Sequence, residues 1–339
     1  MARILIRADA APAIGAGHVM RCLALVEVLQ ERGHDCRFAM AAVTPAIAGL
    51  LADYGLPIDR LPGPIGAARD LAVLCKLAGA ADALVIDGYQ FGAEYRERLA
   101  AVGRPILAFD DGAPAVPLFA TLVVNISSAA LAQDYVARAR GSRLLLGPAY
   151  LPLRKDIRQL IGTPRPADGH LLVTFGGSDP LGLTAPVLRV IAPRLRAKIE
   201  AVLGGSVADP GPALAAAAAF PNRILLHRDT RQLGALMAGA RLAISAAGGT
   251  LAELAALQTP SVLVTVADNQ AAAARLSAGH GWCLAFDGRT DGAVATIVEA
   301  ALALWPDESR LATMSRAAKG LVDGGGPDRL ADALEFLLP

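Results

Sequence analysis

The sequence of 339 residues lacks any long apolar run. Although 54% of its residues are hydrophobic, no stretch reaches the ~18 to 20 continuous apolar residues that span a bilayer. Its first residues lead almost at once into a strand-like segment. They lack the charged head, apolar stretch and cleavage site of a secretory signal. We therefore expect a cytoplasmic protein without a membrane span.

Cysteine and net charge are also scarce; the first argues against a metal site and the second against long-range attraction to a charged partner, with a local basic patch left open as the alternative. The cysteines are scattered at Cys22, Cys36, Cys75 and Cys283, without the close pairing of zinc ligands. We expect the side chains of Cys22 and Cys36 to pack in apolar surroundings within the protein. Scattered cysteines of this kind also fit a protein from a reducing compartment. A net charge of +1 gives no long-range attraction to nucleic acid or anionic lipid.

The sequence does have a regular alternation of short apolar runs and amphipathic stretches. This alternation is typical of parallel sheets covered by helices on both faces. Strands are expected near 3–7, 36–41, 83–87, 106–109, 121–125 and 143–146, and then near 170–175, 198–203, 223–226, 241–244 and 261–265. Helices are expected near 17–31, 66–79, 182–195, 230–239, 250–257, 268–279, 307–320 and 327–337.

Two domains follow from this pattern. Residues 154–167 are polar and contain prolines, as in a linker between domains. We therefore predict an α/β protein with two Rossmann-like domains, the first over 1–153 and the second, with the terminal helices, over 168–339.

A glycine loop followed by a histidine opens the first predicted helix. The strand at 4–7 leads into a segment in which Gly15 and Gly17 precede His18. Glycines let the backbone turn tightly and approach a ligand closely, and a helix start offers unpaired N–H groups. The positive helix end disfavours a protonated imidazole, so His18 fits a general base beside an anion. The alternative is a solvated or capping histidine.

Two common nucleotide-binding fingerprints do not fit this loop. The third glycine of a dinucleotide fingerprint would fall at Met20, and no acidic residue ends the second predicted strand, around residues 38–40. The Lys-Ser/Thr pair of a P-loop is also missing from the segment. The loop therefore indicates a ligand other than NAD or ATP.

Three loops at strand ends in the second half of the chain predict a nucleotide site. Glycines at the carboxyl ends of parallel strands suit a close approach by phosphate, and a helix start can receive a diphosphate. Glu253, one turn along its helix, could accept two ribose hydroxyls; alternatively it is a capping-box partner of Thr250. Ser178 or Asp179 could also cap the following helix. The candidate nucleotide-binding residues are Phe175, Gly176, Gly177, Ser178, Gly248, Gly249, Thr250, Glu253, Asn269 and Gln270.

With these segments, the chain resembles the UDP-sugar hydrolases of pseudaminic acid biosynthesis, a nonulosonic acid pathway, within the broader glycosyltransferase-B-like group. The segments that carry the resemblance are 15–21, 87–89, 109–111, 147–154, 175–180, 247–253, 269–270 and 322–324. They occur in order along nearly the whole chain. The Gly-x-Gly-His-x-x-Arg segment is fairly specific to these hydrolases, whereas Gly-Gly-Thr-x-x-Glu is shared with many transferases.

The resemblance implies two sheets that face a central cleft, with UDP held by the C-terminal domain and the sugar by the N-terminal catalytic domain. It also implies hydrolysis of UDP-2,4-diacetamido-2,4,6-trideoxy-β-L-altropyranose with inversion, without metal or cofactor, with His18 as the general base. Polar residues near the first domain's strand ends and first helix would hold the sugar or the attacking water, with loop caps, turns and ion pairs as the alternatives. These residues, with the loop glycines, are Asp9, Gly15, Gly17, Arg21, Asp87, Tyr89 and Asn125.

Three other functions remain open from the sequence. A glycosyltransferase would use the same nucleotide half with a sugar or lipid acceptor, although loops 42–50 and 62–69 show no basic and apolar patch. A UDP-sugar 2-epimerase is a second enzyme alternative. A two-lobed binding protein without chemistry would not need His18.

Overall fold

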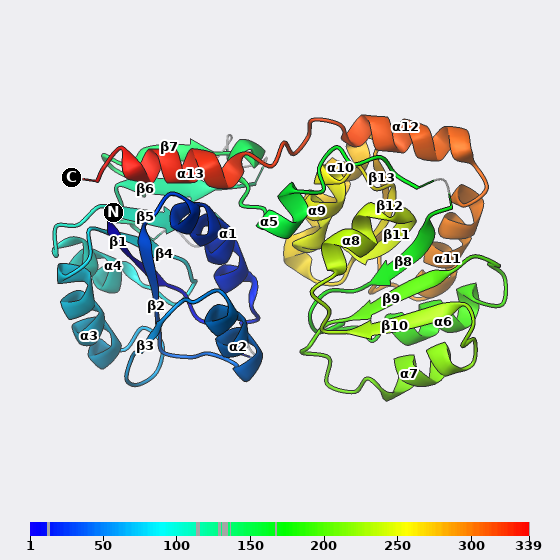
Figure 1. The fold of residues 1–339 in the computed structure, drawn as a ribbon, viewed down its shortest axis with the longest axis horizontal. Helices are drawn as coiled ribbons and strands as arrows, with labels where there is room; N and C mark the ends of the chain where they lie inside the picture. Colours follow the sequence, from blue (N-terminus) through cyan, green and yellow to red (C-terminus); the bar gives the residue numbers. More distant parts are fainter. Residues whose placement is uncertain are drawn as a thin grey trace. The chain divides into compact units, whose positions relative to one another are not determined.

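The structure is a computed structural model that describes residues 1–11, 14–112, 116–127, 130, 135, 137–166 and 168–338. It divides into two compact units (Figure 1). Unit 1 comprises Met1–Lys155 and Gly324–Pro339, and unit 2 comprises Asp156–Asp323. Each unit is built on a parallel sheet of Rossmann-like order, so the predicted fold class is confirmed.

Unit 1 contains a seven-stranded sheet in the order β3-β2-β1-β4-β5-β6-β7. Successive residues of its central strand point to opposite faces, so Ile4 and Ile6 pack in one core and Leu5 in another. Its strands are β1 (Arg3–Arg7), β2 (Asp35–Met40), β3 (Ile58–Arg60), β4 (Ala83–Ile86), β5 (Ile106–Phe109), β6 (Leu122–Asn125) and β7 (Arg143–Leu146).

Helices cover both faces of this sheet. Apolar residues of α1, α2 and α13 share the core that contains Ile4 and Ile6, and those of α3 and α4 share the core that contains Leu5. The helices are α1 (Gly17–Glu31), α2 (Pro45–Asp53), α3 (Ala68–Gly79), α4 (Ala93–Ala100) and α13 (Gly326–Glu335), with the short 3-10 helix η2 (Pro148–Tyr150).

Helix α13 belongs to unit 1, although it follows all of unit 2 in the sequence. Its Leu330 and Leu334 are fully buried in the core of unit 1. Arg32, at the end of α1, donates hydrogen bonds to Asp332 at 2.6 Å and Glu335 at 2.7 Å. The predicted range of 168–339 for the second domain therefore differs from the structure, because an amphipathic helix does not specify by itself which sheet it covers.

The predicted linker also differs from the structure. Residues 154–167 contain the short helix α5 (Lys155–Arg158), and the division between the units falls between residues 155 and 156.

Unit 2 contains a six-stranded sheet in the order β10-β9-β8-β11-β12-β13. Its strands are β8 (His170–Thr174), β9 (Ile199–Leu203), β10 (Ile224–Arg228), β11 (Ala240–Ala246), β12 (Ser261–Thr265) and β13 (Cys283–Asp287). Its helices are α6 (Thr184–Ile191), α7 (Gly211–Ala218), α8 (Leu233–Ala238), α9 (Thr250–Ala256), α10 (Ala271–Gly279), α11 (Ala293–Leu304) and α12 (Glu308–Ala318), with the 3-10 helix η3 (Asp268–Gln270). Within the described ranges, no helix has the length and apolar composition of a membrane span.

The sequence prediction lacks two strands, β3 and β13, and both are edge strands. Most residues of these strands are only partly buried. An edge strand has a neighbour on one side alone, so its sequence needs no continuous apolar run.

Both sheets reverse their strand order at a defined point. The first strand of each unit lies between the second and the fourth, so β1 lies between β2 and β4, and β8 lies between β9 and β11. In open parallel sheets, the crevice outside the carboxyl ends of the strands at such a switch point is where ligands bind. Each unit therefore has one expected ligand position.

The packing of α13 can be tested with a matched pair of truncations. Leu334→Ala should lower the free energy of unfolding of unit 1 by about 2–5 kcal/mol, because it opens a cavity in a closed core. Phe336→Ala removes a larger side chain that is 80% exposed and should have little effect. Denaturant unfolding of the full chain measures both variants. Equal midpoints for the two would contradict the burial of α13 against unit 1.

Candidate active site at the carboxyl ends of the parallel strands

His18 and Asp87 meet at the switch point of unit 1. The loop after β1 leads through Gly15, which has a φ of +71°, into α1, and His18 is the second residue of that helix. Asp87 follows directly after β4. His18 Nδ1 lies 2.7 Å from Asp87 Oδ1, and both side chains are buried. The switch point therefore carries a histidine–carboxylate pair.

The pairing determines which nitrogen of His18 is available for chemistry. An ionised carboxylate can only accept hydrogen bonds, so Nδ1 is the donor in this contact. In the neutral imidazole, the unprotonated nitrogen is then Nε2. A carboxylate that orients a histidine in this way is the arrangement that supports a general base.

Arg21 completes this arrangement from the same helix. It lies three residues after His18, so both side chains occupy one face of α1. Its Nη2 donates to Asp87 Oδ1 at 2.7 Å, and its Nε donates to Asp87 Oδ2. Burial alone would lower the pKa of Arg21, but the charge of Asp87 raises it well above its usual value. The guanidinium therefore stays charged and fixes the carboxylate.

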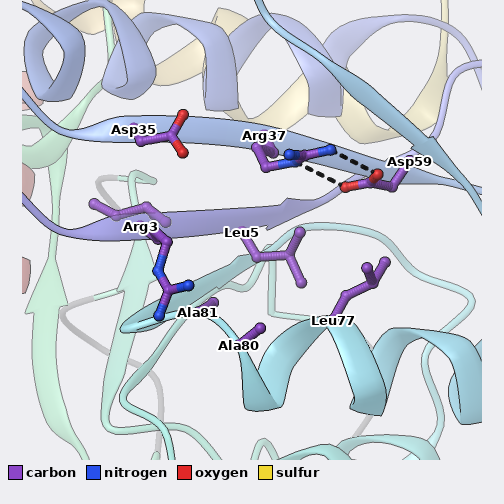
Figure 2. A pocket seen from close by; sticks show the side chains of 9 residues that line it. Arg3, Leu5, Asp35, Arg37, Asp59, Leu77, Ala80 and Ala81 are labelled. Carbon is purple, nitrogen blue, oxygen red and sulfur yellow. Dashed lines mark hydrogen bonds and ion pairs between the residues drawn. The ribbon is translucent and has the colours of Figure 1, made fainter.

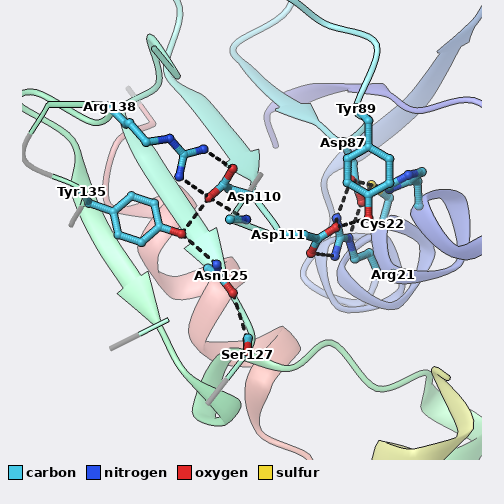
Figure 3. Close-up of polar contacts among 12 residues, drawn as sticks. Arg21, Cys22, Asp87, Tyr89, Asp110, Asp111, Asn125, Ser127, Tyr135 and Arg138 are labelled. Atoms are coloured by element: carbon cyan, nitrogen blue, oxygen red, sulfur yellow. Dashed lines mark hydrogen bonds and ion pairs between the residues drawn. The ribbon is translucent and has the colours of Figure 1, made fainter. Parts of the chain in front are cut away.

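Asp111 and Tyr89 extend the cluster toward solvent (Figure 3). Arg21 Nη1 donates to Asp111 Oδ1 at 2.7 Å, and the hydroxyl of Tyr89 donates to Asp111 Oδ2 at 2.6 Å. The Tyr89 ring packs edge-on against the His18 ring, with 4.7 Å between centroids. Burial and the hydrogen bond to Asp111 raise the pKa of Tyr89, so its hydroxyl remains a donor.

Asp111 is the residue of this cluster that the sequence analysis does not assign to the site. Its signal is the Asp110–Asp111 pair directly after β5. That pair contributes to the family resemblance without showing which of the two carboxylates faces Arg21.

The structure gives Asp9 a role different from the predicted contact with a sugar. Its side chain is only 2% exposed, and it pairs with Arg7, which is itself fully buried. Asp9 Oδ1 accepts from the backbone N–H groups of Ala41 at 2.8 Å and Ala42 at 2.9 Å. These contacts occupy both carboxylate oxygens, so Asp9 holds the strand ends together.

Asn125 is likewise engaged within the fold (Figure 3). Its Nδ2 donates to the hydroxyl of Tyr135 at 2.8 Å, and its Oδ1 accepts from the backbone N–H of Ser127 at 3.0 Å. Its exposure is 1%. The side chain therefore orders the end of β6.

In unit 2, the loop after β8 contains the predicted glycines. Gly176 has a φ of +81°, which glycine adopts without strain. Phe175 is buried, whereas Gly177 and Ser178 are exposed. Asp179 accepts from the backbone N–H groups at the start of α6, 2.9 Å from Leu183 and 3.0 Å from Thr184. Asp179 therefore satisfies two N–H groups at the start of α6, although the N-cap position itself is Leu183.

The loop after β11 lies beside the first one at the switch point of unit 2. Gly249 is the N-cap residue of α9, and Thr250 is the first residue of the helix. A capping box would place the threonine at the N-cap, so the structure does not have that arrangement. The Thr250 hydroxyl donates to the carbonyl of Ala246 at 3.0 Å. Glu253 lies within the first turn of α9.

The third predicted loop approaches the second. Gln270 Oε1 accepts from the backbone N–H of Val266 at 3.0 Å. A side chain carbon at Gly248 would lie 3.5 Å from Gln270 Nε2, so the amide group of Gln270 is next to this glycine. Asn269 lies in η3 with Gln270. The structure therefore brings the loops after β11 and β12 together.

One cavity in unit 1 is remote from these strand ends. It has a volume of about 230 Å³ and lies near the amino ends of β1 and β2, where Arg3 and Asp35 line it (Figure 2). An ion pair between Arg37 and Asp59, at 2.9 Å, borders it. Within the described residues, no group of three or more His, Cys, Asp or Glu side chains could hold a metal ion.

Comparison of the sequence with known proteins gives little information on function. No protein-family model matches the sequence. An uncharacterised protein of Methanocaldococcus jannaschii is 22% identical over 272 residues, which cover 77% of this chain and 55% of that protein. The match thus spans about half the length of that relative.

Solved structures with the glycosyltransferase-B fold align over almost the whole chain. Acinetobacter baumannii MurG has a TM-score of 0.66 and 16% identity, with 99% of this chain and 100% of that chain covered. The calicheamicin glycosyltransferase CalG4 has a TM-score of 0.66 and 19% identity, with coverage of 99% and 98%. Anabaena HepE, in complex with UDP and glucose, has a TM-score of 0.63 and 16% identity, with coverage of 99% and 100%. The chain therefore has the glycosyltransferase-B fold.

The structural role of Asp9 can be tested by its removal. Asp9→Ala should lower the free energy of unfolding of unit 1 by roughly 3–5 kcal/mol, because it breaks a buried ion pair. Asp59→Ala is the matched control: its partner Arg37 is half exposed, and the loss should stay below about 1 kcal/mol. Chemical denaturation measures both. Wild-type stability of Asp9→Ala together with lost ligand binding would instead place Asp9 in the ligand site.

Proposed function

We propose that this chain is a UDP-sugar hydrolase in which His18 activates the attacking water. The observation that carries the proposal is the contact between His18 Nδ1 and Asp87, which leaves Nε2 as the proton acceptor at the switch point of unit 1. The resemblance of residues 15–21 to the hydrolases of pseudaminic acid biosynthesis supports it. The proposed substrate is UDP-2,4-diacetamido-2,4,6-trideoxy-β-L-altropyranose.

In the proposed step, His18 Nε2 accepts a proton from water while the water oxygen forms a bond to the anomeric carbon. The bond between that carbon and the UDP oxygen breaks, and its electron pair stays with the diphosphate. Because the new bond forms on the opposite face, the anomeric centre inverts. UDP is already a good leaving group, so the step needs no strong general acid. Arg21 and Asp87 act as positioning residues that keep the imidazole in this orientation.

We assign UDP to the loops at the switch point of unit 2. The first backbone N–H groups of a helix have no partner within that helix, which makes the amides of Gly248, Gly249 and Thr250 donors for the diphosphate. Donors fixed where negative charge develops lower the barrier to its departure. Glu253 would accept the ribose hydroxyls. The complex of Anabaena HepE with UDP supports a nucleotide in this fold.

A glycosyltransferase is the second candidate, and the likeness to CalG4 favours it. A histidine base serves equally well when the attacking O–H belongs to a sugar or a lipid acceptor. The two candidates therefore share His18 and the UDP site and differ in the acceptor alone.

The role of His18 can be tested by truncation. His18→Ala should reduce kcat for UDP release by about 10²–10⁴-fold, the contribution of a positioned base, while the Kd for UDP stays close to wild type. His280→Ala, at an exposed position after α10, is the matched control and should leave both values unchanged. Steady-state kinetics and calorimetry measure the two quantities. Turnover of His18→Ala close to wild type would contradict the assignment.

The reaction itself can be tested in ¹⁸O-water without any added acceptor. We expect UDP release from the diacetamido sugar nucleotide, with the label in the anomeric hydroxyl of the freed sugar. Label in UDP would mean attack at phosphorus and would overturn the mechanism. Strict dependence on an added sugar or lipid would support the transferase, and recovery of intact nucleotide sugar would indicate a binding protein. Mass spectrometry of both products distinguishes these outcomes.

A further inference from the structure

A small pocket lies beside the His18–Asp87 pair at the carboxyl ends of β4 and β5. Its volume is about 60 Å³, and Asp87 and Arg21 line it together with Arg96 of α4 and Arg138. One water needs about 10–15 Å³ of such cavity volume, so the pocket has room for a group of a few non-hydrogen atoms. One substituent of a sugar ring fits a pocket of this size.

Arg96, which lines this pocket, keeps an unsatisfied hydrogen-bond donor. The residue is only 7% exposed. Its Nε donates to the carbonyl of Phe91 at 2.9 Å and its Nη2 to the carbonyl of Gly88 at 3.4 Å. Its Nη1 is buried and has no hydrogen-bond partner among the described residues. Leaving such a donor unpaired is costly, so an acceptor from a ligand would be stabilised there.

Arg138 adds a second donor of the same kind. Its Nη2 donates to Asp110 Oδ1 at 2.7 Å. Its Nε is buried and without a hydrogen-bond partner in the described part of the chain. Two guanidinium groups that line one pocket thus each keep an unused nitrogen. This pattern points to an oxygen acceptor in the ligand.

The charges around the pocket indicate that this acceptor is neutral. Three arginines and three aspartates line it, and the aspartates are Asp87, Asp110 and Asp111. The six charges balance, so a carboxylate or phosphate would add an uncompensated fourth negative charge in a buried place. A carbonyl oxygen accepts from guanidinium groups without that cost.

Part of the remaining wall is apolar. Phe91, Phe109, Val116 and Leu118 contribute to the lining, and apolar walls favour an alkyl end on the group that carries the acceptor. A carbonyl oxygen together with a short alkyl end is an acyl group. We propose that this pocket binds an N-acyl substituent of the sugar, with Arg96 donating to its carbonyl oxygen. The inference rests on the proposed function and makes Arg96 a specificity-determining residue.

The experiment compares three nucleotide sugars on the wild type and Arg96→Gln. They are UDP-2,4-diacetamido-2,4,6-trideoxy-β-L-altropyranose and two analogues in which one acetamido group is replaced by hydroxyl. The wild type should disfavour one analogue by about 10- to 100-fold in kcat/KM, the value of a hydrogen bond to a charged group. Arg96→Gln should lose this preference while it keeps its rate on that analogue. Calorimetric Kd values for the same compounds give a readout that does not depend on turnover.

Controls separate specificity from damage to the fold. Arg98→Gln, on the same helix but 58% exposed, should retain the wild-type preference. An equal loss on all three compounds by Arg96→Gln, or no preference in the wild type, would overturn the proposal. Should Arg96→Gln fail to fold, the Kd values of the wild type for the two analogues still test the pocket, because only the analogue without the bound acyl group should lose affinity. Binding preference without UDP release would contradict the hydrolase proposal alone.

Discussion

The candidate site depends on one buried carboxylate. Asp87 is 1% exposed, and a negative charge at that depth persists only when donors surround it. Those donors are His18 and Arg21, one turn apart on α1. Satisfying Asp87 therefore fixes the rotation of α1 against the end of β4, and with it the direction of the imidazole. The same contact stabilises the fold and prepares the chemistry.

The sheet order explains why such a contact arises at this place. At the switch point β1 and β4 are neighbours in the sheet, so the segments that follow these two strands come close enough for His18 and Asp87 to make contact. Unit 2 repeats the order, and its glycine loops after β8 and β11 occupy the corresponding position. The same strand order thus positions the buried Arg21–Asp87 ion pair in unit 1 and the backbone N–H groups of the glycine loops in unit 2.

The sequence predicts the strand series and the residues that follow the strands, because buried parallel strands require continuous apolar runs and their ends collect polar residues. It does not predict what those polar side chains contact. Asp9 and Asp87 both follow strands of one sheet, yet Asp9 turns to the buried Arg7 and Asp87 to His18. Asp111 is missed for the same reason, since its partner Arg21 is distant in sequence. Helix α13 is predicted as a helix but assigned to the wrong unit, because its amphipathic face fits either sheet.

The arrangement also separates catalytic power from specificity. An oriented imidazole removes a proton from any O–H group that reaches Nε2, so the His18–Asp87 pair does not by itself distinguish water from a sugar acceptor. Discrimination must come from groups that hold the sugar and from those that exclude larger nucleophiles. The pocket lined by Arg96 and Arg138 lies next to Asp87 and can anchor one ring substituent there. A sugar anchored at that point has fewer orientations open to it, so under the proposed function recognition of a substituent would contribute to the rate as well as to the choice of substrate.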